Sequence, residues 1–307
     1  MSLSAAEFTA RSHCPLCGSQ NMLDHFVFDG IRTAICKECR FTFTRDIRSH
    51  AEIEQQYILG YDDKRQMDGQ TVNAVVNYQL LRRFVPDWSK KSILDVGSGY
   101  GLFLNETRKG GVQRAVGVEL SDAEREFSTR QLNIETYRKL SELPKNERFD
   151  IITLFEVIEH TPQPGEVVDA ACSHLKSGGS LIIGTDNFES EVVKVLGDRF
   201  PKWIPHQHIS LFAPHSLRTL VNQVGGLQIV GARSFTPWEL RARQIIYLTT
   251  KGRFGGQKFS LQTAESQEKG RRYNCFALRL ALNGYWFKWT NRQDLNGAMM
   301  YLHARKA

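Results

Sequence analysis

The stretch SILDVGSGYG, residues 92–101, predicts a buried strand that ends in a glycine-rich turn. A dinucleotide-binding turn needs the spacing G-x-G-x-x-G, which leaves room for a pyrophosphate at a helix N-terminus. Here the third glycine, Gly101, comes one residue early, and Leu102 takes the dinucleotide position. Asp95 would repel a pyrophosphate, whereas a positively charged ligand is attracted to a nearby carboxylate. The turn therefore predicts a cationic ligand.

A second apolar strand is expected over residues 113–120, with an acid near its end. Glu119 lies twenty residues after Gly99, where a carboxylate can accept hydrogen bonds from both hydroxyls of a ribose. Ser121 and Glu124 have the S-x-x-E spacing of a capping box, which predicts a helix directly after the strand. Strand, glycine turn, helix, strand, acid and capped helix make one βαβ unit.

Four segments in this order resemble the class I S-adenosylmethionine (SAM)-dependent methyltransferases. They are ILDVGSGYG, the acid in GVEL at 117–120, FDIITLFEVIEH at 149–160 and LKSGGSLII at 175–183. An unrelated Rossmann-like domain is the alternative that a single glycine motif leaves open. The resemblance implies an α/β fold with a Rossmann-like sheet covered by helices on both faces, and SAM as the cofactor. It implies contacts to SAM from Tyr57, Asp95, Gly97, Ser98, Gly99, Gly101, Glu119, Leu120, Leu140, Phe155 and Glu156.

Periodicity and turn signals predict six strands, with helices between them, near residues 92–96, 113–118, 149–154, 179–184, 227–233 and 298–304. Such alternation predicts a parallel sheet that is covered on both faces. The last strand, MMYLHARK, resembles the antiparallel edge strand that ends this fold. Val72, Val76, Leu80 and Phe84 recur every fourth residue, which predicts a helix that stops before Pro86.

The chain of 307 residues has room for one large domain and a smaller module. We expect a zinc ribbon over 1–48, a helical connector over 49–90 and a SAM-binding Rossmann-like domain over 91–235. The final strand, within 296–307, completes this domain after an inserted segment over 236–295. The sequence has neither an apolar stretch long enough to span a bilayer nor a signal-peptide pattern, so we expect a cytoplasmic location.

Cys14, Cys17, Cys36 and Cys39 form two C-x2-C pairs with eighteen residues between them. Four thiolates at this spacing can close a tetrahedral zinc site with no open coordination position, so the metal would serve the fold alone. Two disulfides or a redox pair are the alternatives, and they are less expected in a chain without a secretion signal. The ribbon has few apolar residues of its own, which implies that the metal supplies much of the stability of its fold.

Two histidines are candidates for a general base, which methyl transfer needs only when the acceptor atom carries a proton that must leave. His208 is the first candidate. Its segment, HQHISLF at 206–212, resembles the H-E-H-x-x-x-F element of zinc-ribbon methyltransferases that act on deoxysugars. Gln207 replaces the glutamate of that element, which argues against C-methylation and for O- or N-methylation by His208. A histidine that is buried and satisfied by the backbone is the alternative.

His160 is the second candidate base. It follows Glu156 and Glu159 after a predicted strand, at the edge where open α/β sheets bind ligands. Its V-I-E-H segment resembles the part of the family that lies beside the methionine end of the cofactor, and a loop-packing role for Glu159 and His160 is the alternative. Tyr57 and Tyr61 lie where the family places tyrosines near the cofactor and the acceptor. Packing between ribbon and helix would explain these tyrosines equally well.

The inserted segment carries the whole excess of positive charge. Residues 236–295 contain eleven Lys and Arg residues and four acidic residues, and this difference equals the net charge of +7. Bulky apolar residues lie among these cations, and such a mixture suits an acceptor with an anionic head and an apolar body. A helical lid whose charges are solvated is the alternative.

Three functions remain open. The first is SAM-dependent methylation of an O or N atom, or less readily a C atom, of a small molecule such as a sugar nucleotide, polysaccharide precursor or secondary metabolite. The second is RNA methylation with the basic insertion as the binding surface; against it, the ribbon mixes acids with its cations and the sequence has no N-P-P-Y element. The third is a cofactor-binding partner protein without catalysis, which requires both histidines to lie far from the methyl group.

Overall fold

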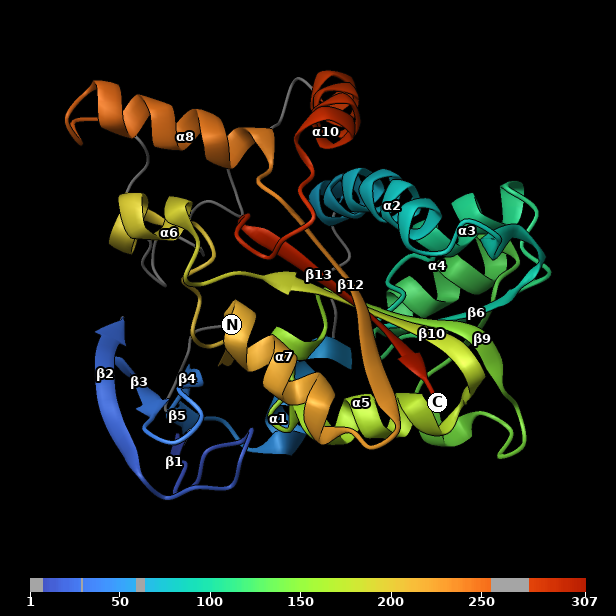
Figure 1. The fold of residues 1–307 in the computed structure, drawn as a ribbon, viewed down its shortest axis with the longest axis horizontal. Coiled ribbons are helices and arrows are strands. Elements are labelled where there is room, and N and C mark those ends of the chain that lie inside the picture. Colours follow the sequence, from blue (N-terminus) through green and yellow to red (C-terminus); the bar gives the residue numbers. More distant parts are fainter. Residues whose placement is uncertain (1–7, 29, 59–63, 255–275) are drawn as a thin grey trace.

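A seven-stranded sheet forms the centre of the computed structural model, which describes residues 8–28, 30–58, 64–254 and 276–307 (Figure 1). The strand order across this sheet is β12-β13-β10-β9-β6-β7-β8. The strands are β6 (Ser92–Val96), β7 (Arg114–Val118), β8 (Glu135–Tyr137), β9 (Phe149–Phe155), β10 (Leu175–Asp186), β12 (Leu227–Phe235) and β13 (Met299–Lys306). All six predicted strands are present, and β8 is a short addition at one edge.

The last strand is antiparallel, as predicted, but its predicted position at the edge is wrong. β13 pairs with β10 on one side and with β12 on the other, antiparallel to both. Its first six residues, 299–304, are all buried, as expected of a strand that is covered on both faces and paired on both sides. The edge belongs to β12, where Val230 is exposed.

Helices cover both faces of the sheet. They are α1 (His50–Ile58), α2 (Lys64–Phe84), α3 (Leu102–Lys109), α4 (Asp122–Leu132), α5 (Pro164–Ser173), α6 (Glu191–Leu196), α7 (Pro214–Gln223), α8 (Trp238–Thr249) and α10 (Phe276–Thr290). Short 3-10 turns are η1 (Trp88–Lys90), η2 (Leu140–Glu142), η3 (Ile158–His160) and η4 (Gly197–Arg199). α2 contains the helix predicted from the four-residue spacing and ends at Phe84. No helix in the described ranges has the length and apolarity to cross a membrane.

Neighbouring residues of one strand pack against opposite faces of the sheet, because side chains alternate along a strand. Ile93, Ile151 and Ile182 belong to the core beneath α2 and α3. Leu94 and Ile152, each one residue further on, belong to the core beneath α5 and α7. The continuous apolar runs in these strands therefore reflect burial on both faces.

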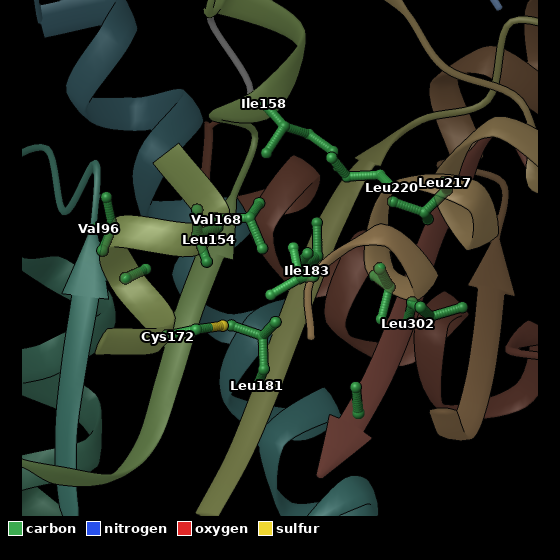
Figure 2. Packing of buried hydrophobic residues seen from close by; sticks show 14 of the residues in the cluster. Val96, Leu154, Ile158, Val168, Cys172, Leu181, Ile183, Leu217, Leu220 and Leu302 are labelled. Carbon is green, nitrogen blue, oxygen red and sulfur yellow. The ribbon is translucent and has the colours of Figure 1, made fainter. Parts of the chain in front are cut away.

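The core beneath α5 and α7 is continuous across the sheet. Figure 2 shows Val96, Leu154 and Ile183 from adjacent strands together with Val168 of α5 and Leu217 of α7. Pairing and this close-packed core hold β6, β9 and β10 in register. Their carboxyl ends therefore form a rigid edge on which side chains can be placed accurately.

The N-terminal ribbon shares its core with the large domain. It forms a four-stranded sheet of β2 (Met22–Phe28), β3 (Ile31–Cys36), β4 (Thr42–Thr44) and β11 (Ser210–Leu211), and beside it β1 (Thr9–Ala10) pairs with β5 (Asp46–Ile47). β11 is contributed by the large domain. Phe41 and Phe43 are fully buried, and the Phe41 ring lies 4.8 Å from that of Phe212. The prediction that a metal supplies much of the ribbon's stability did not take this shared core into account.

Phe287 attaches α10 to the rest of the protein. It is fully buried, its ring meets Phe235 edge to face at 5.0 Å, and the Arg83 guanidinium lies over it. We expect Phe287→Ala to lower the free energy of unfolding by about 3–5 kcal/mol, because it leaves a cavity that its neighbours cannot fill. Urea denaturation measures this loss. Trp289→Ala, on the exposed side of the same helix, is the control and should change stability by about 0.5 kcal/mol or less; equal losses would contradict the assignment.

Candidate active site

A cleft of about 770 Å³ opens at the carboxyl ends of β6, β7 and β9, the edge at which open α/β sheets bind ligands. α1 and α2 form its opposite wall. Ten of the residues predicted to contact the cofactor line it: Tyr57, Asp95, Gly97, Ser98, Gly99, Glu119, Leu120, Leu140, Phe155 and Glu156. Gly101 is not among the lining residues. It caps α3 with φ +73° and packs against Ser128.

The glycine turn after β6 brings its backbone close to the loop that follows the neighbouring strand β9. Gly97 has φ +72°, in the left-handed region that favours glycine. A Cβ atom at this position would lie 2.5 Å from Cγ2 of Val157. Any larger residue at position 97 would therefore push the β9 loop out of place.

Two carboxylates form the floor of the cleft. Asp95 is 4% exposed and accepts a hydrogen bond of 2.6 Å from the hydroxyl of Thr153. The two oxygens of Glu119 accept hydrogen bonds of 2.8 Å from the backbone N–H groups of Gly99 and Ser121. Both side chains are thus held in fixed orientations, while each Glu119 oxygen keeps a lone pair for a ligand.

The predicted capping box is only half right. The hydroxyl of Ser121 does accept a hydrogen bond from the backbone N–H of Glu124 at the start of α4. The reciprocal bond to the Ser121 N–H comes from Glu119 and not from Glu124. The Glu124 carboxylate instead accepts hydrogen bonds of 2.8 and 2.7 Å from the amides of Gln66 and Gln70 on α2. Glu124 therefore ties α4 to the helix across the cleft.

Three carboxylates lie in this part of the cleft: Asp95 and Glu124 are buried, and Glu119 is partly buried. Burial raises the pKa of Asp95 to about 7 and that of Glu124 to about 8, and the nearby charge of Glu119 adds to both shifts. The pKa of Glu119 is also raised by burial. Within the described residues none of the three has a salt bridge to Lys, Arg or His. A cationic ligand would favour their charged forms.

A fourth carboxylate, Glu156, forms the wall after β9. Its backbone has φ +56°, a strained conformation for a residue with a side chain, and its N–H donates to the Gly184 carbonyl. The carboxylate accepts hydrogen bonds from the Asn73 amide at 2.5 Å and from Lys202 Nζ at 2.8 Å. Contacts from α2 and from the segment before β11 thus hold Glu156 in place. Such strain is typical of functional sites.

A charged network that the sequence analysis missed lies behind this wall. Lys202 Nζ is 2.9 Å from Oδ1 of the fully buried Asp186, at the end of β10. Burial raises the pKa of Asp186 to about 7, and burial together with the charge of Glu156 raises that of Glu159 to about 7. Glu159 accepts a hydrogen bond of 2.8 Å from the hydroxyl of Thr185 and does not line the cleft. The network therefore lies one layer below the surface of the cleft.

The two candidate histidines lie in contact, one in front of the other. His160 lines the cleft, and its Nδ1 is 3.1 Å from the carbonyl oxygen of Gln207. A carbonyl only accepts, so Nδ1 carries the proton and Nε2 keeps its lone pair. His208 does not line the cleft; it is 6% exposed, with its ring 4.7 Å from that of His160 and its Nδ1 3.8 Å from Asp186.

Burial disfavours the charged form of both histidines. Burial lowers the pKa of His160 below its ordinary value, and burial together with His160 lowers that of His208 well below it. The ring of Tyr57 lies 5.8 Å from that of His160, so this tyrosine borders the same part of the cleft. Tyr61, the other predicted tyrosine, lies outside the described residues.

Comparison with known proteins identifies the family. The profile of a family described as a methyltransferase domain matches residues 66–230, more than half of the chain. This protein belongs to the class I SAM-dependent methyltransferases. The ubiquinone biosynthesis O-methyltransferase of Coxiella burnetii is 31% identical over 154 residues, which cover 46% of this chain and 64% of that protein. The mitochondrial enzyme of the same name from Candida albicans is 29% identical over 170 residues, 49% of each chain.

The methyltransferase thus matches less than two thirds of the length of these relatives. Among solved structures, a SAM-dependent methyltransferase of Thermotoga maritima, described as a possible histamine N-methyltransferase, aligns with a TM-score of 0.53. It is 14% identical, and the alignment covers 83% of this chain and 99% of that one. At this identity the likeness shows the fold alone, in agreement with the strand order of the methyltransferase.

The four N-terminal cysteines of the methyltransferase form one cluster. All four Sγ atoms lie within 4.8 Å of one another, with Cys14 and Cys39 at 3.6 Å and Cys17 and Cys36 at 3.5 Å. A tetrahedral zinc ion with Zn–S bonds of about 2.3 Å needs sulfurs roughly 3.8 Å apart, whereas a disulfide needs about 2.05 Å. The spacing therefore suits a metal, and all four cysteines are free thiols.

The ribbon that contains the cysteine cluster also supports the loop that carries His208. The Thr44 hydroxyl donates to the Pro205 carbonyl and the Thr44 N–H donates to the Ile209 carbonyl, both at 2.9 Å. β4 and β11 therefore fix both ends of the segment that contains Gln207 and His208. The basic insertion lies elsewhere, because no described residue of 236–295 lines the cleft.

The cost of burying Asp95 can be measured through pH. Its raised pKa means that the folded state keeps a proton that the unfolded state loses from about pH 4 upward, so stability falls as the pH rises to about 7. Asp95→Asn removes this penalty and still accepts the Thr153 hydrogen bond. Without cofactor, we expect the variant to gain stability over wild type by about 2 kcal/mol more at pH 8 than at pH 5, in urea denaturation.

Asp150→Asn is the matched control for Asp95→Asn. Partial burial opposes ionisation of Asp150, but hydrogen bonds from Ser92 and Lys176 outweigh it and hold its pKa at about 2. Asp150 is therefore ionised in both states at pH 5 and at pH 8, and its replacement should cost the same stability at both. A pH-independent effect of Asp95→Asn would show that Asp95 is charged in the folded, unliganded protein.

Proposed function

We propose that this methyltransferase transfers a methyl group from SAM to an oxygen or nitrogen atom of a small-molecule acceptor. The observation that carries the proposal is the cleft itself, which is lined by the carboxylates of Asp95 and Glu119 and also by His160. The carboxylates suit a cationic donor, and the histidine suits an acceptor that must lose a proton. The family of the chain supports the same conclusion.

The cleft fits the cofactor in its chemistry. The hydroxyl of Ser98 is buried without a hydrogen-bond partner among the described residues, which points to a ligand that fills its bonding capacity. We assign Glu119 to the ribose hydroxyls, Asp95 to the cationic part of SAM, and Leu120 with Leu140 to the faces of the adenine. When bound, SAM supplies an electrophilic methyl group.

We assign the role of general base to His160 in preference to His208. His160 lines the cleft and keeps an Nε2 lone pair, whereas His208 lies behind it. When His160 accepts a proton, the charges of Glu156 and Asp186 stabilise the imidazolium. His208 and Glu159 then act as positioning residues that support His160 and its loop.

The relatives and the residue next to His208, Gln207, support a class of acceptor. The relatives named as ubiquinone O-methyltransferases favour oxygen as the methylated atom, and Gln207 cannot act as the acid-base partner that C-methylation would need. Suitable acceptors are sugar nucleotides, polysaccharide precursors and secondary metabolites with a hydroxyl group. RNA is not favoured, since α10 of the basic insertion packs on α2 and no described residue of the insertion lines the cleft.

His160→Gln tests the base. We expect turnover on an acceptor found in a panel of hydroxylated metabolites to fall by about 10²–10⁴-fold. Calorimetry should give an affinity for S-adenosylhomocysteine within about twofold of wild type, since glutamine keeps a polar group in the wall. Because the pKa of His160 is lowered, wild-type kcat should stay constant from pH 8 down to about 6.5 and fall only at lower pH.

His208→Gln is the control, and it should reduce kcat less than His160→Gln while leaving the acidic limb of the pH profile in place. The opposite order of effects would transfer the role of base to His208. A wild-type protein that binds neither SAM nor S-adenosylhomocysteine would overturn the proposed function as a whole.

We further propose that Cys14, Cys17, Cys36 and Cys39 hold one structural zinc ion. Cys36→Ser should lose the zinc that elemental analysis finds in the wild type, and it should lower the Tm by more than about 4 °C, the shift expected for roughly 1–2 kcal/mol. The buried Cys172, outside the cluster, provides the control: Cys172→Ser should keep the zinc. Wild-type protein that contains no zinc after purification without chelators would contradict the assignment.

A further inference from the structure

Most of the large apolar side chains that face solvent belong to two neighbouring helices. α8, the turn after it and α10 contribute eight of the twelve such residues in the described chain. We call these eight residues the α8–α10 face: Trp238, Ile245, Ile246, Leu248, Phe254, Leu278, Tyr285 and Trp289. The exposed fraction reaches 57% for Leu248, 62% for Phe254 and 69% for Trp289. So dense a group of exposed apolar side chains indicates an interaction site.

The exposed side of each helix is apolar, which reverses the usual pattern of a surface helix. On α8, Leu240 and Gln244 point inward while Trp238 and Ile245 face solvent. On α10, Asn283 and Phe287 are buried. Leu278, Tyr285 and Trp289 lie at spacings of seven and four residues, which places them together on the opposite side.

The two helices are joined into one unit. The Glu239 carboxylate of α8 accepts hydrogen bonds from Arg279 at 2.7 Å and from Asn283 at 2.8 Å, both on α10. α8 packs on α6 and α10 packs on α2, so their free sides point away from the sheet. Figure 1 shows both helices at the end of the molecule opposite the N-terminal ribbon.

The charged residues beside the α8–α10 face indicate which kind of partner it binds. Glu239 is the only acidic residue in 238–254 and 276–290, and it is occupied by Arg279. Arg243, Lys251, Arg253 and Lys288 have no salt bridge within the part of the chain that the structure describes. A second copy of this face would bring like charges together. Aliphatic, Trp and Tyr side chains beside unpaired cations suit the interface of an anionic lipid bilayer.

We propose that the α8–α10 face docks on a membrane surface that contains anionic lipids. The apolar side chains enter the boundary between headgroups and acyl chains, while the lysines and arginines contact lipid phosphates. α2 lies between this face and the cleft: Gln79 donates to the Gly284 carbonyl of α10, and Asn73 and Asn77 line the cleft. The docking does not depend on which acceptor the enzyme methylates.

Sedimentation of the full chain with vesicles tests the proposal. We compare vesicles of phosphatidylcholine alone with vesicles that also contain phosphatidylglycerol, at low and at high salt. Wild type should bind the anionic vesicles, and binding should weaken as the salt concentration rises. The double variant Ile245→Glu, Leu248→Glu should lose this binding at least about tenfold. The triple variant Lys251→Gln, Arg253→Gln, Lys288→Gln should weaken it about a hundredfold.

The control double variant is Leu23→Glu, Val230→Glu, which changes exposed apolar residues on β2 and β12, outside the α8–α10 face. It should bind the anionic vesicles as wild type does. Because all substituted residues are exposed, thermal unfolding should be nearly the same in every variant, and the triple variant keeps the test valid if the glutamates disturb the fold.

Four outcomes would overturn the proposal. The first is that wild type sediments with neither vesicle, and the second is that the control variant loses binding as fully as the variants of the α8–α10 face. The third is a dimer in analytical ultracentrifugation that Ile245→Glu, Leu248→Glu dissociates. That result would assign the face to contact between copies of the chain. The fourth is salt-independent binding to both kinds of vesicle, which would remove the role of anionic lipid.

Discussion

The structure depends on keeping three carboxylates of the cleft desolvated and oriented, although none of them has a salt bridge within the described residues. Asp95, Glu119 and Glu124 are held by a hydroxyl, by backbone N–H groups and by amides. These neutral donors fix the carboxylates without cancelling their charge. Their desolvation weakens the unliganded fold, and the same desolvation strengthens attraction to a cation that enters the cleft. Stability is thus exchanged for ligand recognition at this edge of the sheet.

Local patterns in the sequence were sufficient for much of this arrangement. The apolar run before Gly97 and the acid at Glu119 predicted two strand ends correctly, because strand and turn signals are set by a few adjacent residues. The position of β13 could not be predicted in this way, since strand pairing joins residues more than a hundred positions apart. The second half of the capping box was wrong for a related reason: Glu119, outside the motif, accepts the hydrogen bond from the Ser121 N–H.

The deeper part of the site was partly within reach of sequence reasoning. Gln66, Gln70 and Asn73 on α2 recur at helical spacing, and this polar stripe beside an apolar one could have been identified as a second ligand-facing surface. Asp186 lies two residues after the predicted strand 179–184 and could have been added to the candidates at that edge. Lys202 gave no signal, because a single lysine in a loop is usually solvated. The depth order of His160 and His208 is a property of packing alone.

β11 gives the cysteine ribbon a structural role that the ribbon's own residues do not indicate. In sequence the ribbon is a separate module, yet its sheet is completed by Ser210 and Leu211, which lie within the histidine segment 206–212. Thr44 of β4 holds both ends of the loop that contains Gln207, and the Gln207 carbonyl sets the tautomer of His160. The ribbon can therefore influence which nitrogen of the candidate base carries the proton. The cysteine cluster and the candidate base are therefore linked by contacts that run from Cys36 through β3, β4 and β11 to the loop of Gln207, whose carbonyl bonds to His160.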